Sequence, residues 1–174
     1  MANTDRPHGF DIFGPLLRLR PYDVVVGYGT AIFVGDVAVG AAAGGIEAAT
    51  TVTAVTKVGS AQSYSAASTA ATAEAGNPVL VADDPHQMFE AQDDAGGTSA
   101  TTWIHNSFDH VAGAGSTTTL LSAHELGGAS ASTSDGGFVI LDLVTRVDNT
   151  AGDNADWVCQ MNQGESILTL AGGV

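Results

Sequence analysis

The segment Val79–Asp94, VLVADDPHQMFEAQDD, predicts a strand, an acidic turn and a second strand. Val79–Val81 is a short apolar run, and the turn-forming residues Asp83-Asp84-Pro85 interrupt it. In Met88–Gln92 polar and apolar residues alternate, which is typical of a strand with one buried face. The run DDAGG, which begins at Asp93, predicts a further turn. The stretch therefore indicates a β-rich fold.

Short strands separated by small-residue turns are predicted along the remaining chain. The predicted strands are Val24–Val26, Ala31–Val34, Val37–Val39, Ile46–Thr56, Phe138–Val147, Trp157–Asn162 and Ile167–Leu170. The stretch Gly59–Gly76 predicts a surface loop or a short helix, because its Ala, Ser and Thr residues offer little to bury. Short strands, Gly-rich turns and the lack of long helical periodicity predict an all-β fold, either a β-barrel or a jelly-roll-like sandwich.

Residues 1–22 are expected to form an extended arm ahead of a single β-rich domain of residues 23–174. Pro7, Pro15 and Pro21 exclude a helix of useful length in this arm. The arm combines many apolar side chains with three of the five basic residues of the chain. Because free apolar side chains are unfavourable in water, the arm is expected to lie on its own domain or to bind a neighbouring chain.

The charge balance limits the classes of partner. Nineteen acidic residues against five basic ones give a formal net charge of −14 at pH 7. A chain with this charge repels nucleic-acid phosphates and anionic membrane surfaces, whereas a positively charged protein surface is an acceptable partner. No nucleic-acid or membrane partner is therefore expected.

The cellular compartment is predicted from cysteine use and from the absence of targeting patterns. Cys159 is the single cysteine, so an intrachain disulfide is excluded. The sequence has no apolar run of about 18 residues, and its start, MANTDRPHGF, lacks the pattern of a secretory signal. The protein is therefore expected to be made in a cytoplasm and to stay reduced there.

Residues that bind metals are scattered along the sequence. His105, Asp109 and His110 would begin a metal site, but no second cluster with ligand spacing accompanies them. The stretch Asp148–Asp156 does not place acids or amides at the alternating positions of a calcium loop, so it predicts an acidic hairpin turn. We therefore predict no metal and no cofactor.

Catalytic motifs are equally weak. No serine lies in a G-x-S-x-G turn, and Cys159 lies within an apolar strand. Glu90 and Asp142 are available as an acid and a base, but any acidic sequence offers such pairs. Trp103 and Trp157 are interpreted as core or interface residues rather than as a platform for sugar stacking. We therefore predict that the chain is not an enzyme.

Four short blocks occur in order from the start of the chain to its end. The first is MANTDRPHGF, with Asn3, Pro7, Gly9 and Phe10. The second is TAIFVGDVAV, with Thr30, Ala31, Phe33, Gly35 and Asp36. The third is VLVADDPHQMFEAQDD, with Asp83, Asp84, Pro85, Phe89, Glu90 and Gln92. The fourth is DNTAGDNADWVCQMN, with Asn149, Gly152, Asn154, Ala155 and Trp157.

Together these blocks resemble a family of small virion structural proteins of tailed bacteriophages, which are commonly interpreted as capsid decoration, or cement, proteins. The shared residues are turn formers and core anchors, so the resemblance implies no catalytic residue. It implies binding to the major capsid protein on the outer surface of the virion, after assembly in the host cytoplasm. Analogy with decoration proteins also implies a homotrimer that matches the local threefold axes of the shell.

The arm, Asn3–Tyr22, is the predicted capsid-binding element, although it is more apolar after Phe10 than the family pattern. The predicted contact residues are Arg6, Pro7, Phe10, Phe13, Leu16, Arg18 and Arg20. The acidic remainder would face solvent and keep particles apart. Two alternatives stay open. One is another virion component, such as a head-fibre base or tail protein, and the other is a carbohydrate-binding or hydrolytic module that uses Trp103 or Trp157.

Overall fold

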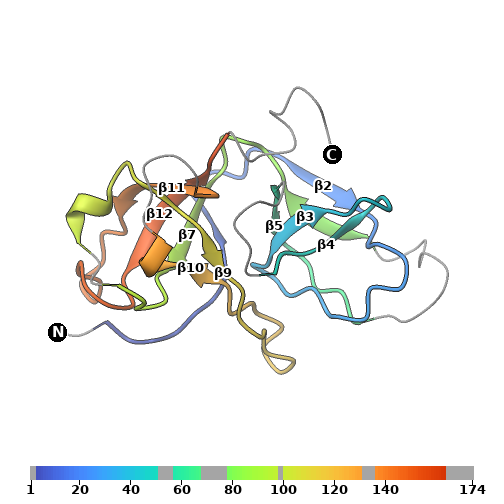
Figure 1. The fold of residues 1–174 in the computed structure, drawn as a ribbon, viewed down its shortest axis with the longest axis horizontal. Helices are drawn as coiled ribbons and strands as arrows, with labels where there is room; N and C mark the ends of the chain where they lie inside the picture. Colours follow the sequence, from blue (N-terminus) through green and yellow to red (C-terminus); the bar gives the residue numbers. More distant parts are fainter. Residues whose placement is uncertain (1–2, 51–56, 68–77, 98–99, 131–135, 164–174) are drawn as a thin grey trace.

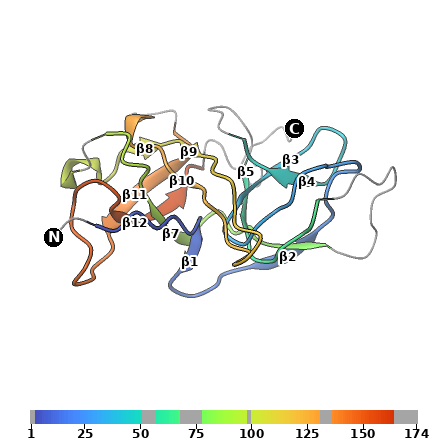
Figure 2. The ribbon, with the colours of Figure 1, turned by 90° about the horizontal axis from the view of Figure 1, so that it is seen from below.

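The computed structural model describes residues 3–50, 57–67, 78–97, 100–130 and 136–163, and it confirms the all-β class. Twelve strands and two short 3-10 turns, η1 (Thr101–Trp103) and η2 (Gly128–Ser130), make up its regular structure. The strands form two five-stranded antiparallel sheets and one two-stranded ladder. Figures 1 and 2 show the two sheets in neighbouring lobes, and a β-barrel or jelly roll is not confirmed. In the described residues, no helix has the length and hydrophobicity to cross a bilayer.

The first sheet has β12 at its centre. In spatial order its strands are β1 (Asp11–Phe13), β7 (Met88–Gln92), β12 (Asp156–Met161), β11 (Phe138–Leu143) and β8 (Ser107–Phe108). Phe89 pairs with Cys159, and Cys159 pairs with Ile140. Because residues opposite each other in a sheet share a face, these three side chains form one apolar row in the larger core.

The second sheet has β5 at its centre. In spatial order its strands are β2 (Leu19–Tyr22), β6 (Val79–Ala82), β5 (Lys57–Ala61), β3 (Val37–Gly40) and β4 (Ile46–Ala48). Alternation in β3 directs Val37 and Val39 into the larger core and Ala38 into a second, smaller core. The remaining strands, β9 (His110–Val111) and β10 (Glu125–Leu126), pair with each other, and Leu126 also forms an isolated bridge with Asp93 just after β7.

The stretch Val79–Asp94 forms β6 and β7 as predicted, but the two strands belong to different sheets. The acidic turn between them is therefore a crossover between sheets. Asp83 in this turn has no exposed surface, and its carboxylate accepts hydrogen bonds from Arg18 Nε and the Tyr22 hydroxyl, both at 2.6 Å. A buried carboxylate needs such donors, so the crossover depends on the N-terminal segment.

The N-terminal segment is extended, but it is not an arm ahead of the domain. β1 pairs with β7 at the edge of the first sheet, and β2 pairs with β6 at the edge of the second. Just before β1, Phe10 is 0% exposed and its ring stacks on Phe138 with centroids 4.3 Å apart. Phe10 N donates to Gly35 O at 2.8 Å, and Ser60 Oγ donates to Phe10 O at 2.6 Å. The division at residue 22 is therefore corrected, because both sheets use this segment as an edge strand.

Two predicted strands and one predicted loop are wrong. Val24–Val26 and Ala31–Val34 form isolated bridges, because their backbone groups bond to several different segments. The start of Gly59–Gly76 lies in β5 rather than in a loop or helix, and residues 68–76 of this stretch lie outside the described part of the chain. A Cβ at Gly59 would lie 2.1 Å from Ala82 O, so the missing side chain lets β5 and β6 approach closely.

The remaining predicted strands fall into two groups. Val37–Val39 is confirmed as β3, Phe138–Val147 as the shorter β11, and Trp157–Asn162 as β12. Ile46–Thr56 is confirmed only at β4, since residues 51–56 lie outside the described part of the chain, as does Ile167–Leu170.

The position of Phe10 predicts a large stability effect. Phe10→Ala should lower the free energy of unfolding by roughly 3–5 kcal/mol, because it removes a fully buried ring from between two sheets. Phe13→Ala makes the same change on the same segment at a half-buried position, so its loss should stay below about 2 kcal/mol. Urea unfolding measures both, and equal losses would contradict the central position of Phe10.

Candidate functional site

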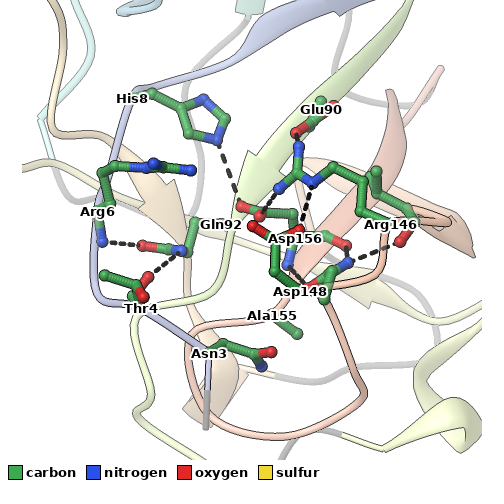
Figure 3. Close-up of polar contacts among 12 residues, drawn as sticks. Asn3, Thr4, Arg6, His8, Glu90, Gln92, Arg146, Asp148, Ala155 and Asp156 are labelled. Atoms are coloured by element: carbon green, nitrogen blue, oxygen red, sulfur yellow. Dashed lines mark hydrogen bonds and ion pairs between the residues drawn. The ribbon is translucent and has the colours of Figure 1, made fainter. Parts of the chain in front are cut away.

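The first, third and fourth sequence blocks meet around the start of the chain (Figure 3). Asn3 Nδ2 donates to Thr150 O at 2.8 Å, and Thr150 N donates to Asn3 Oδ1 at 3.0 Å. Gln92 Nε2 donates to the carbonyl oxygens of Thr4 and Asn154, both at 3.0 Å. These bonds attach the N-terminal segment to β7 and to the turn between β11 and β12.

Glycines allow the first and second blocks to touch. Gly9 has φ +80°, and a Cβ there would lie 2.5 Å from Ser122 Cβ. Gly35 has φ +92°, and a Cβ there would lie 2.7 Å from His8 O. Neither position has room for a side chain, and both use a backbone conformation that glycine adopts at low cost. These residues are therefore turn formers, as their pattern predicts.

A buried carboxylate joins the third and fourth blocks. Asp93, directly after β7, accepts hydrogen bonds from Ala155 N at 2.9 Å and Trp157 Nε1 at 3.2 Å. It also accepts from Ala95 N at 3.0 Å and Asn154 N at 3.2 Å. Burial raises the pKa of Asp93, and these donors oppose the rise. These contacts fix two turns of the fold. The Asp93 carboxylate is fully buried, so it is not presented to a substrate or ligand.

An ion-pair cluster lies where the blocks meet. Arg146 donates to Glu90 and to Asp156, and its Nε lies 3.7 Å from Asp148 Oδ1. His8 Nε2 lies 3.3 Å from the other oxygen of Asp156, and Figure 3 shows His8 and Arg146 on different sides of this carboxylate. The five residues come from the N-terminal segment, β7, the β11–β12 turn and β12.

The cluster does not have the properties of a metal centre. Donor atoms of His8, Glu90 and Asp156 lie within 4.8 Å of one another, and no second group of this kind occurs in the described residues. Hydrogen bonds to Asp11 and then Asp156 raise the pKa of His8 to about 9, so its imidazole is protonated at neutral pH. Arg146 already binds both carboxylates, and the protonated His8 places a second positive charge beside Asp156. The arrangement is therefore a structural ion-pair network.

The predicted capsid-contact residues differ in exposure. Phe10 is buried in the core, which corrects the prediction that it contacts a partner. The exposed members are Arg6, Leu16 and Arg20, and the half-buried members are Pro7, Phe13 and Arg18. Arg18 donates from both Nε and Nη2 to Asp83, so much of its hydrogen-bonding capacity is used inside the protein.

Exposed leucines extend this surface beyond the predicted residues. Leu16, Leu17, Leu19 and Leu80 are 46, 50, 38 and 37% exposed, and we call these four residues the β2 surface. Leu80 pairs with Pro21 across β2 and β6, so it shares a face with Leu19. The signal in the sequence for Leu80 is its place between Val79 and Val81. A strand directs successive side chains to opposite faces, so Leu80 lies on the face opposite these two valines.

The sugar-binding and catalytic candidates are not assembled into a site. Trp103 and Trp157 are both buried, with ring centroids 5.9 Å apart, so neither presents a face for sugar stacking. The Glu90 carboxylate is not available as a catalytic acid or base, since it accepts a hydrogen bond from Arg146. Glu90 and Asp142 also lie two strands apart in one cross-strand row, a separation of about 10 Å.

The cysteine and the predicted metal ligands have structural surroundings. Cys159 is fully buried, and burial raises the pKa of its thiol far above the ordinary value, so the thiol stays protonated and unreactive. His105 is exposed whereas His110 is buried. Within the described residues, His105, Asp109 and His110 are not brought together as a ligand set.

Comparison of the chain with protein-family models, with curated proteins and with solved structures finds no match in any of the three.

His8 predicts a pH-dependent stability. Its pKa is raised from 6.5 to about 9 in the folded chain. The contribution of His8 to the free energy of unfolding is therefore fully present below pH 6.5 and is lost as the pH rises through 9. Between about pH 6.5 and about pH 10, the free energy of unfolding should fall in wild type by about 2 kcal/mol more than in His8→Asn. Urea unfolding across this range measures the difference.

His105→Asn is the matched control. His105 is exposed and has φ +71°, a conformation that asparagine tolerates, so this variant should keep the wild-type pH profile. A wild-type profile in His8→Asn would contradict the assigned role of His8.

Proposed function

We propose that this protein is a capsid decoration, or cement, protein of a tailed bacteriophage, which binds the outer surface of the major-capsid-protein shell and stabilises the head. The observation that carries the proposal is the β2 surface, a group of four exposed leucines on an otherwise acidic chain. The ordered set of four blocks that resemble such proteins supports the same function. The protein acts by adhesion and converts no substrate.

The composition of the β2 surface indicates the kind of partner. Exposed apolar patches with polar rims mark sites of protein association. Residues 12–22, which supply Leu16, Leu17 and Leu19, contain no acid, and Arg20 adjoins them with a side chain 54% exposed. This surface fits an apolar seam between capsid subunits that carries acidic residues at its rim. The remaining acidic surface then faces solvent and repels other particles.

Asp83 orders the β2 surface before any partner arrives. Its buried carboxylate accepts from Arg18 and Tyr22, which lie on either side of Leu19 along the segment. Because the segment is already ordered, binding costs less conformational entropy than the folding of a free arm. Pro21 removes one N–H from the edge of the sheet, so contact is expected through side chains rather than through an added strand.

The assembly and the alternatives follow from the same proposal. We propose a homotrimer, by analogy with decoration proteins, formed in the host cytoplasm before or during head assembly. Another virion component, such as a head-fibre base or a tail protein, would offer the same features, and imaging of the particle separates it from a decoration protein. The sugar-binding alternative loses support, because both Trp103 and Trp157 are buried.

Binding to bare capsids tests the β2 surface. The double variant Leu16→Asn, Leu17→Asn should weaken binding at least tenfold, about 1.4 kcal/mol, because two apolar contacts are lost. Co-sedimentation of capsids with increasing amounts of purified protein measures the affinity. The matched control is Leu120→Asn, Leu121→Asn, at positions 38 and 40% exposed on a different loop. Asparagine also tolerates the positive φ of Leu120, so this control should bind as wild type does.

The possible outcomes separate the surface from the function. If only the control variant bound more weakly, the β2 surface would be rejected as the contact, but the proposed decoration function would be retained. Failure of wild type to bind capsids, together with its absence from the outer shell in electron micrographs of the particle, would reject decoration itself. Light scattering of the free protein tests the homotrimer.

A further inference from the structure

Four buried polar side chains lie between the β9–β10 ladder and the second sheet. They are His110 on β9, His124 just before β10, Asp36 just before β3 and Lys57 on β5, and none is more than 3% exposed. Figures 1 and 2 show β9 and β10 on the side of the first lobe that faces β5. We call these four residues the seam cluster.

Within the seam cluster, His124 is held at both ring nitrogens. Val37 N donates to His124 Nδ1 at 3.3 Å, so the ring proton is assigned to Nε2. His124 Nε2 lies 3.5 Å from Asp36 Oδ1, and Phe33 N donates to Asp36 Oδ2 at 2.8 Å. Burial lowers the pKa of His124, and the charge of Asp36 opposes this. A neutral His124 whose Nε2–H points toward Asp36 therefore matches the geometry.

His110 has fewer polar contacts. Its ring stacks on His124 with centroids 5.5 Å apart, and in the described residues neither of its ring nitrogens has a hydrogen bond of normal geometry. Lys57 reaches across from β5, since a Cβ at Gly137 would lie 2.2 Å from Lys57 Nζ. Burial, followed by the charges of His124 and Lys57, lowers the pKa of His110 to about 3, and backbone groups just after β4 oppose this weakly.

We propose that the seam cluster is an acid-sensitive contact, which releases the β9–β10 ladder from the second sheet when His110 takes up a proton. Three elements face His110: the segment before β10 with His124, β5 with Lys57, and the segment just after β4 with the backbone of Ala49 and Thr50. A proton on His110 adds a positive charge to an enclosed space beside His124 and Lys57, all three of which are almost fully buried. Movement of the ladder gives the imidazolium access to water, which removes the cost of burying it.

The ladder is also the element most easily released. β9 and β10 pair over two residues each, whereas β12 pairs over five with β7 and over five with β11. Local opening follows the weakest set of contacts, so acid is expected to open the ladder while the first sheet stays intact.

Glu125 acts in the opposite direction on global stability. It lies on β10 and pairs with Val111, so by alternation it occupies the face of the ladder opposite His110. Burial and the nearby carboxylates of Asp5 and Asp94 raise the pKa of Glu125 from 4.5 to about 7. Its protonation in this range favours the closed ladder as well as the folded chain, so release of the ladder is measured by local exchange in a Glu125→Gln background, which removes this titration.

Amide hydrogen exchange of the full chain at about pH 7, 6 and 5 provides that measurement. Val37 N–H, bonded to His124, and Gly127 N–H, bonded to Asp109 O at 2.8 Å, report on the ladder. After correction for intrinsic exchange rates, their protection should fall about threefold from pH 7 to 6 and about eightfold from pH 6 to 5, which is the dependence for one imidazole of ordinary pKa that takes up its proton on opening. Amides of β12 should keep their protection. Equal loss in β12, or no loss at Val37 and Gly127, would overturn the proposal.

Substitution of His110 by phenylalanine tests the residue itself. His110→Phe keeps a stacked ring that takes up no proton, so the protection of Val37 and Gly127 should no longer depend on pH. His105→Asn, at an exposed histidine, should behave as wild type does. If His110→Phe does not fold, nitrogen-15 NMR of the wild-type histidine rings replaces it. A His110 that titrates near pH 6.5 while the ladder stays protected would overturn the proposal.

Discussion

The burial of Phe10 between the two sheets is the contact on which the rest of the structure depends. Its ring stacks on Phe138 of the first sheet, and its carbonyl accepts from Ser60 of the second. Because one residue is held by both sheets, the chain that follows it can run along both of them, first as β1 at the edge of the first sheet and then as β2 at the edge of the second. Gly9 and Gly35 permit this, since a side chain at either position would collide with neighbouring atoms. The N-terminal segment therefore belongs to the folded body and stabilises it.

The acidic residues of the chain have two distinct physical roles. Asp83 and Asp93, on either side of β7, are buried acceptors whose donors come from segments distant in sequence. Without those donors, a buried carboxylate would cost several kcal/mol, so each one specifies which segments must lie beside it. Most other acids give the chain its net charge of −14. Arg18 and Arg146 neutralise internal carboxylates, which leaves few cations to face a partner.

The residues that carry the family resemblance and the residues proposed to bind the capsid are largely different sets. Asn3, Gly9, Gln92 and Asn154 attach the N-terminal segment to the body, and they make these contacts whether or not a partner is present. The β2 surface is exposed and lies mostly outside the matched positions. Such a division suits a structural protein, because a common framework can present different contact surfaces to different shells.

The sequence by itself determined the all-β class and the positions of the strands with strong alternation, such as β7 and β12, because a period of two is a local property. It also identified the turn at Asp83 and the core role of Trp157. Only the tertiary structure decided that this turn crosses between sheets, that Phe10 is buried, and that His110 stacks on His124. The reason is that strand partners and burial depend on contacts between residues far apart in the chain. Local sequence is the same for a hairpin and a crossover, and for an apolar residue on an exposed edge and one in the core.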